Sequence, residues 1–135
     1  MKTFSQDEML SFFESVKDTE YHSVFYTALF TGMRRSELLA LRWSDIDLDL
    51  GVISINRNLH HLADKSFVFQ PPKTAKSRRQ VPLAPSNAIV LKLHRERQRA
   101  TRLLMDQPVQ DDSLVFARYM EVHFYLTQSP KPGDD

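Results

Sequence analysis

The sequence predicts an α+β fold that is mainly helical and carries a small sheet in its middle. Apolar residues recur at helical spacing before residue 47 and again after residue 86. Between them, residues 52–83 contain three short runs rich in β-branched or other apolar residues, which is typical of strands. The chain has 135 residues, 41% of them hydrophobic, and this suffices for one domain or part of one with a real core.

Composition excludes several classes of protein. The sequence has no cysteine, so neither a disulfide framework nor a cysteine-based zinc site is possible. No apolar run reaches the length of a membrane span, and the first residues lack the pattern of a signal peptide. We therefore expect a soluble, intracellular protein with no membrane partner.

The net charge of +1 conceals an uneven distribution of charge along the chain. Residues 1–50 carry five basic and nine acidic side chains, whereas residues 73–102 carry nine basic side chains and one acid, Glu96. Residues 103–135 are acidic again, with two bases and six acids. The basic middle indicates a polyanionic partner, and the alternative is a solvated basic helix face.

Two helices are expected before the glycine at position 32. A capping box at residues 5–8 precedes an amphipathic helix over residues 6–17, with apolar residues at helical spacing. Residues 21–30 are aromatic and apolar and predict a buried helix that ends at Gly32. The expected core residues of this second helix are Phe25, Ala28, Leu29 and Phe30.

The stretch from residue 30 to 47, FTGMRRSELLALRWSDID, predicts a placed arginine. Gly32 allows a turn with positive φ. Arg34 then falls in the first turn of a helix with an apolar stripe, with Glu37 one turn further on. A guanidinium held by a packed helix suits bidentate capture of a phosphate. The alternative is that Arg34 and Arg35 form an ordinary surface pair.

Three strands are expected after this helix, over residues 52–56, 67–70 and 80–83. Pro82 cannot donate a backbone hydrogen bond, so the third strand should lie at an edge of the sheet. Residues 58–66 are expected to form a polar loop that contains His60, His61 and Asp64. We do not expect this loop to bind a metal ion, because neighbouring residues in a loop rarely converge on one ion.

A long helix is expected over residues 86–105, followed by a short strand over residues 111–116. Basic side chains are spread around the remainder of the helix surface. The apolar residues that suggest its buried face are Ile89, Val90, Leu93 and Leu104.

The stretch around Arg34 resembles the first conserved box of the tyrosine recombinases, the phage-integrase family of site-specific DNA recombinases. The resemblance implies that Arg34 binds the scissile phosphate and that Glu37 gives structural support. Arg35 occupies a variable place in the family pattern and receives no catalytic role. The matching residues are Thr31, Gly32, Arg34, Glu37, Leu38, Leu41, Trp43, Asp45 and Ile46.

A second match follows at residues 73–83, where a lysine, a short polar turn, an arginine and an apolar-Pro-Leu strand succeed one another. The resemblance implies that Lys73 is the general acid for the leaving 5′ oxygen. Lys76 is its nearest competitor for that role. Arg78 and Arg79, together with Lys76, are expected to bind the DNA backbone.

The resemblance covers about residues 3–116, a partial integrase catalytic domain with helices on either side of a three-stranded antiparallel sheet. Residues 117–135 are expected to be a divergent or disordered tail. His94 and Arg97 satisfy a His-x-x-Arg pattern by letter, but the family context is missing, and we expect a charged helix surface there. Tyr119 and Tyr125 come too early for the nucleophile, and His123 has no matching box.

The resemblance implies a fragment or truncated form of a tyrosine recombinase that acts in DNA integration and recombination. The family reaction cleaves and rejoins DNA through a 3′-phosphotyrosine and needs no metal or nucleotide cofactor. The expected partner is the DNA phosphate backbone, with self-association on DNA in the full-length form. We expect a cytoplasmic, nucleoid-associated product of a bacterial or phage-derived mobile element. The alternative is a non-catalytic DNA-binding or regulatory remnant of an integrase.

Overall fold

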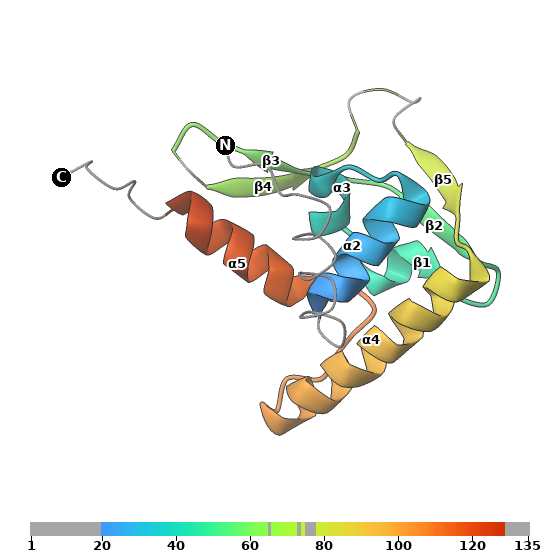
Figure 1. Cartoon of the computed structure of the whole chain (residues 1–135). Helices are drawn as coiled ribbons and strands as arrows, with labels where there is room; N and C mark the ends of the chain where they lie inside the picture. Colours follow the sequence, from blue (N-terminus) through green and yellow to red (C-terminus); the bar gives the residue numbers. More distant parts are fainter. Residues whose placement is uncertain (1–19, 65, 73, 75–77, 129–135) are drawn as a thin grey trace, which may run out of the picture.

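The computed structural model describes residues 20–64, 66–72, 74 and 78–128 (Figure 1). The helix expected over residues 6–17 lies outside these residues. The helices are α2 (Glu20–Thr31), α3 (Arg35–Leu39), the 3₁₀ turn η1 (Trp43–Asp45), α4 (Pro85–Leu104) and α5 (Ala117–Gln128). The strands are β1 (Ile46–Asp47), β2 (Val52–Ile55), β3 (Asn58–His61), β4 (Phe67–Gln70) and β5 (Arg79–Pro82).

A three-stranded antiparallel sheet is present, with β2 in the centre and β1 and β5 on its two sides. Its third member is β1, which the sequence does not predict, and not the strand over residues 67–70. Ile53 lies opposite Ile46 on β1 and opposite Val81 on β5, so apolar residues meet across the sheet. Ile53 and Ile55 are buried and alternate with half-buried residues along β2. Pro82 lies in the edge strand β5, as the sequence predicts.

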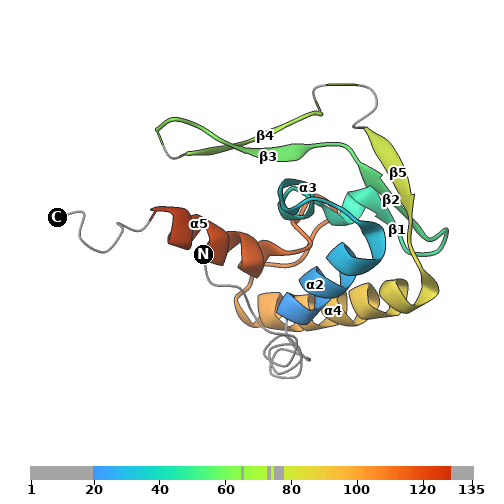
Figure 2. The same ribbon diagram turned by 45° about the horizontal axis from the view of Figure 1, so that its top comes forward.

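The strand over residues 67–70 forms as expected but belongs to a different sheet. It pairs with β3 in a separate two-stranded hairpin, and the polar loop expected over residues 58–66 is therefore partly wrong. Asn is depleted in strands, and here pairing with β4 and burial of Leu59 outweigh that preference. Figure 2 shows this hairpin extending past the three-stranded sheet, above α5.

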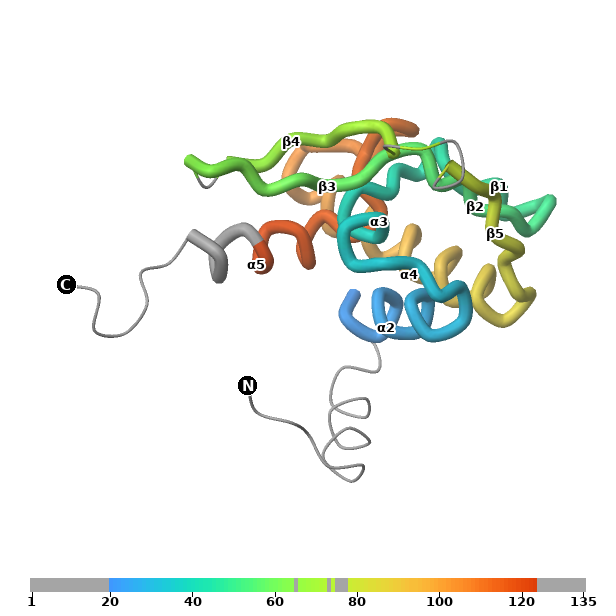
Figure 3. The backbone as a smooth tube through the Cα atoms, turned by 90° about the horizontal axis from the view of Figure 1, so that it is seen from above, coloured from blue at the N-terminus to red at the C-terminus, as the bar shows by residue number. Residues whose placement is uncertain are grey.

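The short helix α3 lies between this hairpin and α2, as the view from above shows (Figure 3). Arg57 fixes the base of the hairpin, because its Nε donates to the Ala40 carbonyl at 2.8 Å. The guanidinium of Arg57 also lies 4.1 Å from the centroid of the Phe69 ring. Through Arg57, which directly precedes β3, the two contacts connect the end of α3 to Phe69 on β4.

The buried face of α4 differs from the one expected. Ile89 and Leu93 are 59% and 52% exposed, and Leu104 is 90% exposed. The helix instead buries the residues at 87, 88, 91 and 94, which form one stripe at helical spacing. Two members of this stripe are polar and form hydrogen bonds inside the fold, which an apolar pattern does not reveal. They are Asn87 and His94.

Two further expectations about burial and order are changed by the structure. Leu29 and Phe30 at the end of α2 are exposed rather than buried, whereas Ser23, Val24 and Thr27 are the buried residues of this helix. Residues 111–116 contribute an isolated bridge between Arg42 and Leu114 instead of a full strand. Residues 117–128, where a divergent or disordered tail is expected, form α5.

The first turn of α5 is held by α2. The Glu20 carboxylate accepts a hydrogen bond from the Tyr119 backbone N–H, which would otherwise lack a partner within its own helix. The Tyr21 and Tyr119 rings meet edge to face, with centroids 5.9 Å apart. Burial is the largest influence on Glu20 and raises its pKa, although the backbone bond acts in the opposite direction.

Candidate phosphate-binding site

A tight reversal between α2 and α3 places Arg34. The Gly32 N–H donates to the Ala28 carbonyl at 3.0 Å, and its φ of 69° turns the chain away from the helix axis. The Thr31 hydroxyl donates to the Thr27 carbonyl at 2.6 Å and accepts from the Met33 N–H at 3.2 Å. Met33 is buried, so the backbone that leads into Arg34 is anchored in the core.

Arg34 occupies the N-cap position of α3, with extended backbone angles of −76° and 156°. Its N–H donates to Glu37 Oε1 at 2.9 Å, and its carbonyl accepts from the Leu38 N–H at 3.0 Å. The side chain is exposed. Among the described residues, no carboxylate forms an ion pair with its guanidinium. The backbone of Arg34 is thus fixed while its charge faces solvent.

Glu37 is the buried acid that holds this cap, with an exposed fraction of 4%. Besides the Arg34 N–H, its carboxylate binds the guanidinium of Arg79, at 2.9 Å from Nη1 to Oε2 and 3.3 Å from Nη2 to Oε1. A buried carboxylate is tolerated when it is paired and hydrogen-bonded in this way. The supporting role that the sequence suggests for Glu37 has this physical basis.

Arg35 is also exposed, but its charge acts on a different part of the fold. Its charge helps to lower the pKa of His123 on α5, after burial and the neighbouring His61. Successive residues at a helix start point in different directions, so the two arginines cannot serve one phosphate equally. Arg34 is the better candidate, because its backbone is fixed by the buried Glu37.

The remaining predicted site residues divide into three groups. Lys73 and Lys76 lie outside the described residues. Arg78 is exposed and immediately precedes β5. Arg79, for which we expect contact with the DNA backbone, has its guanidinium bound to Glu37. Sequence reasoning missed this pair because its members are 42 residues apart. The one signal that could have pointed to the pair is that a glutamate buried in the fold needs a cationic partner.

A second buried carboxylate organises the helix exit. Asp45 accepts from the Arg42 N–H at 3.0 Å and from its guanidinium at 3.2 Å. The Asn56 amide donates to the same carboxylate at 3.0 Å. These hydrogen bonds fix the turn that follows α3 and connect it to the segment that follows β2. The Asp of the Trp-Ser-Asp-Ile-Asp run therefore has a structural role here.

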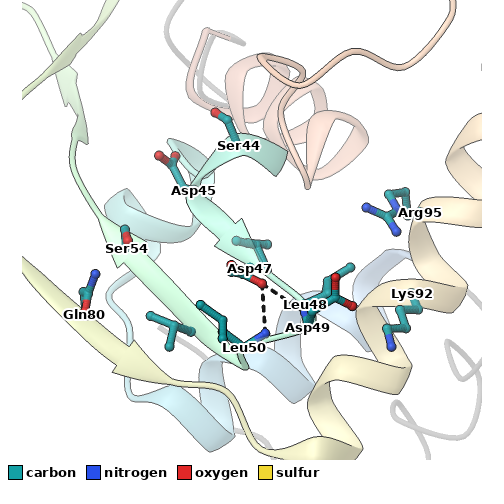
Figure 4. A pocket seen from close by; sticks show the side chains of 12 residues that line it. Ser44, Asp45, Asp47, Leu48, Asp49, Leu50, Ser54, Gln80, Lys92 and Arg95 are labelled. Carbon is teal, nitrogen blue, oxygen red and sulfur yellow. Dashed lines mark hydrogen bonds between the residues drawn. The ribbon is translucent and has the colours of Figure 1, made fainter.

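A hollow of about 550 Å³ lies between the turn after β1 and α4 (Figure 4). Lys92 and Arg95 line it from α4, Asp47 lines it from the end of β1, and Asp49 lines it from the turn. Asp47 Oδ1 accepts from the Asp49 N–H at 3.1 Å and the Leu50 N–H at 2.9 Å, so this carboxylate closes the turn. The acids make this hollow a poorer phosphate site than the exposed Arg34.

His94 is buried rather than on a charged helix surface, which corrects the expectation for this residue. Its Nε2 lies 2.5 Å from the Val115 carbonyl, and its ring packs against Trp43 and Phe116. Burial is the main cause that lowers its pKa. These contacts give His94 a place in the core.

The histidines of the hairpin lie apart from one another. His61 Nε2 is 3.3 Å from His123 Nε2 on α5, while His60 points to the other face of β3. Across the described part of the chain, no three or more His, Asp or Glu side chains gather as metal ligands would. None of the described helices combines the length and apolar character needed to cross a bilayer.

The family model described as "Phage integrase family" matches residues 2–127, and the chain belongs to this family. The match includes α5 up to residue 127 and extends beyond residue 116, where the resemblance in the sequence fades.

Relatives of known sequence agree with this membership. The chain is 33% identical over 111 residues to the tyrosine recombinase XerC-like protein of Caldanaerobacter subterraneus subsp. tengcongensis, covering 76% of this chain and 28% of that protein. It is 38% identical over 95 residues to the ICEBs1 integrase of Bacillus subtilis, covering 69% of this chain and 25% of the relative. The chain thus spans about a quarter of the length of these relatives.

Solved structures show the same fold. The Tn1549 transposon integrase in complex with transposon right end DNA aligns with a TM-score of 0.58 at 20% identity, over 72% of this chain and 32% of that one. The same integrase in complex with circular intermediate DNA aligns with a TM-score of 0.57. The arrangement of helices around a small antiparallel sheet is therefore that of an integrase.

Proposed function

We propose that this chain supplies the phosphate-binding part of the catalytic domain of a tyrosine recombinase that cleaves and rejoins DNA. The proposal rests on the way in which Arg34 is held and exposed. Its backbone is held by the buried Glu37, and its guanidinium has no acid partner among the described residues. A fixed, exposed guanidinium can bind two oxygens of one phosphate.

In the proposed reaction, a tyrosine hydroxyl attacks a DNA phosphodiester. This leaves a 3′-phosphotyrosine and releases a 5′ hydroxyl. Arg34 would stabilise the negative charge that grows on the phosphoryl oxygens in the transition state. Lys73 would donate a proton to the leaving 5′ oxygen. We do not assign Tyr119 as the nucleophile, because its ring packs against Tyr21 on α2.

DNA as the partner is supported by two independent features. The Tn1549 integrase, whose fold this chain shares, is bound to DNA in its solved structures. Residues 73–102 carry nine basic side chains against one acid, and several of those on α4 are exposed. Lys and Arg that replace counterions on phosphates make binding depend on salt.

The test is DNA binding by the 135-residue chain, measured by fluorescence anisotropy at several salt concentrations. If roughly three or four basic side chains contact phosphates, the slope of log affinity against log salt should be about −3 to −4. Arg34→Ala should weaken binding roughly tenfold and reduce the slope by about one.

Two matched variants make the test specific. Arg35→Ala removes the same charge from the next residue and should weaken binding less, as a peripheral charge does. Arg34→Lys should recover only part of the affinity, because an ammonium cannot reproduce the two-pronged contact. Equal losses at positions 34 and 35, or binding that does not respond to salt, would contradict the proposal.

A further inference from the structure

We propose that Arg79 is a positioning residue for the phosphate site: it occupies the carboxylate of Glu37 and thereby keeps the guanidinium of Arg34 available for DNA. This inference rests on the proposed function. It replaces the expectation that Arg79 contacts the DNA backbone directly.

The geometry places Glu37 between the two arginines. One carboxylate oxygen accepts from the Arg34 backbone N–H at 2.9 Å, and the other accepts from Arg79 Nη1 at 2.9 Å. A second N–H of Arg79 reaches the first oxygen at 3.3 Å. The carboxylate therefore has a fork of donors on one side and a backbone donor on the other, and both oxygens are used.

The charge at this point explains why the pairing matters. The Glu37 side chain is only 3% exposed, so water can do little to stabilise its negative charge. Without Arg79, the carboxylate would need another cation. Arg34 is three residues away on the same helix start, at a spacing that allows side chains to meet. A guanidinium that turns back to Glu37 would no longer face a phosphate.

Arg79 is itself held in place by the sheet. It begins β5, and its backbone lies opposite Ile55, the buried last residue of the central strand β2. The side chain then crosses from the sheet edge to α3, where its exposed fraction of 38% leaves one side open to solvent. This open side is why direct contact with DNA must be tested against the positioning role.

The experiment is a double-mutant cycle on DNA binding by the full chain, with the same duplex and salt series for every variant. Arg34→Ala and Arg79→Ala should each weaken binding roughly tenfold and reduce the salt slope by about one. The double variant R34A/R79A should lose no more than either single variant, because both remove the same phosphate contact.

A rescue variant distinguishes a positioning role of Arg79 from direct contact of Arg79 with DNA. In E37Q/R79A no carboxylate remains to capture Arg34, so binding should recover to within about threefold of the unaltered chain, with the slope restored. Arg78→Ala is the matched control, since Arg78 is exposed and adjacent. Its loss should add to that of Arg34→Ala, and Glu37→Gln should not rescue it.

Three results would overturn the inference: additive losses in R34A/R79A, no recovery in E37Q/R79A, or unchanged binding in R79A. Circular dichroism and thermal melts establish which variants fold. If R79A does not fold, E37Q/R79Q replaces the ion pair with two neutral amides and should bind with a slope that still depends on Arg34. If Arg34→Ala did not change the salt slope in the E37Q/R79Q background, the inference would also be overturned. If Arg34→Ala had no effect on DNA binding in the unaltered chain, the proposed function itself would be refuted.

Discussion

Gly32 sets the direction in which the site residue leaves α2, and it does so by its backbone alone. Its φ is 69°, and an added Cβ would meet no atom beyond the neighbouring residues of the chain within 4 Å. Gly32→Ala should therefore lower the free energy of unfolding by about 1–2 kcal/mol, the cost of a left-handed backbone for an L-residue. Urea unfolding measures this loss.

A second glycine provides the comparison. Gly51 has a φ of 73°, and its added Cβ would lie 3.2 Å from the Leu83 carbonyl oxygen. Gly51→Ala should lower stability more than Gly32→Ala, because it adds a steric conflict to the same backbone cost. An equal or smaller loss at position 51 would show that the close contact with the Leu83 carbonyl adds no cost to that of the backbone conformation.

Single residues also show what the sequence can reveal about a site. Gly32, Arg34 and Glu37 are close in the chain, and their spacing predicts the turn and a carboxylate one helical turn after the arginine. The resemblance to the family, and not the spacing, implies that Glu37 gives support, and the role of Arg34 stays a prediction. Arg79 could not be assigned in this way. Its partner depends on how β5 is placed beside α3, and that is a property of the tertiary fold.

At the scale of whole elements, the buried side of α4 depends on polar contacts. Asn87 is fully buried, and its amide donates to the equally buried Thr27 hydroxyl at 3.1 Å. Asn87→Ala should lower the free energy of unfolding by about 1–3 kcal/mol, because it leaves the Thr27 hydroxyl without this partner and opens a space. Thermal or urea unfolding is the measurement.

Leu93→Ala is the control on the same helix. Leu93 is 52% exposed, so its truncation should change stability by less than about 0.5 kcal/mol. The contrast is the reverse of what the apolar pattern suggests. A larger loss at Leu93 than at Asn87 would mean that the packing face of α4 is the one expected from the sequence.

The elements themselves were largely predictable, whereas their partners were less so. The expected helices over residues 21–30 and 86–105 and the strand over 67–70 correspond to α2, α4 and β4. Periodicity and β-branched runs are local signals, and they identify such elements. The pairing of β4 with β3 was missed, because Asn58 and His60 carry no strand signal of their own. The buried face of α4 was missed because its polar residues find partners only in the folded chain.

For the molecule as a whole, the buried histidine makes stability depend on pH. Burial lowers the pKa of His94 below its ordinary value of 6.5, so the folded state favours the neutral ring. The unfolded chain binds a proton on this imidazole near pH 6.5, whereas the folded chain binds it only at a lower pH. The free energy of unfolding should therefore fall as the pH drops below about 6.5, by at most about 1.4 kcal/mol per pH unit for one proton.

Other groups contribute to the same curve, so the measurement must isolate His94. His123 has its pKa lowered by burial, His61 and Arg35, and it acts in the same direction. Glu20 has a raised pKa, so the stability it contributes is complete below about 4.5 and is lost as the pH rises through its folded value. Because Glu20 lies 3.7 Å from His94, a variant is needed to separate the two.

His94→Gln keeps an N–H donor near the position of Nε2 but cannot take up a proton. Urea unfolding at pH 7.5, 6.5 and 5.5 should show a smaller loss of stability in this variant than in the unaltered chain. His22→Gln is the control, because His22 is only half-buried and contacts the Tyr26 ring on the surface of α2. It should leave the acid-induced loss in place. The opposite result would be a full acid-induced loss of stability in His94→Gln and none in His22→Gln. The acid sensitivity would then come from the surface of α2 and not from the core contact between α4 and Val115.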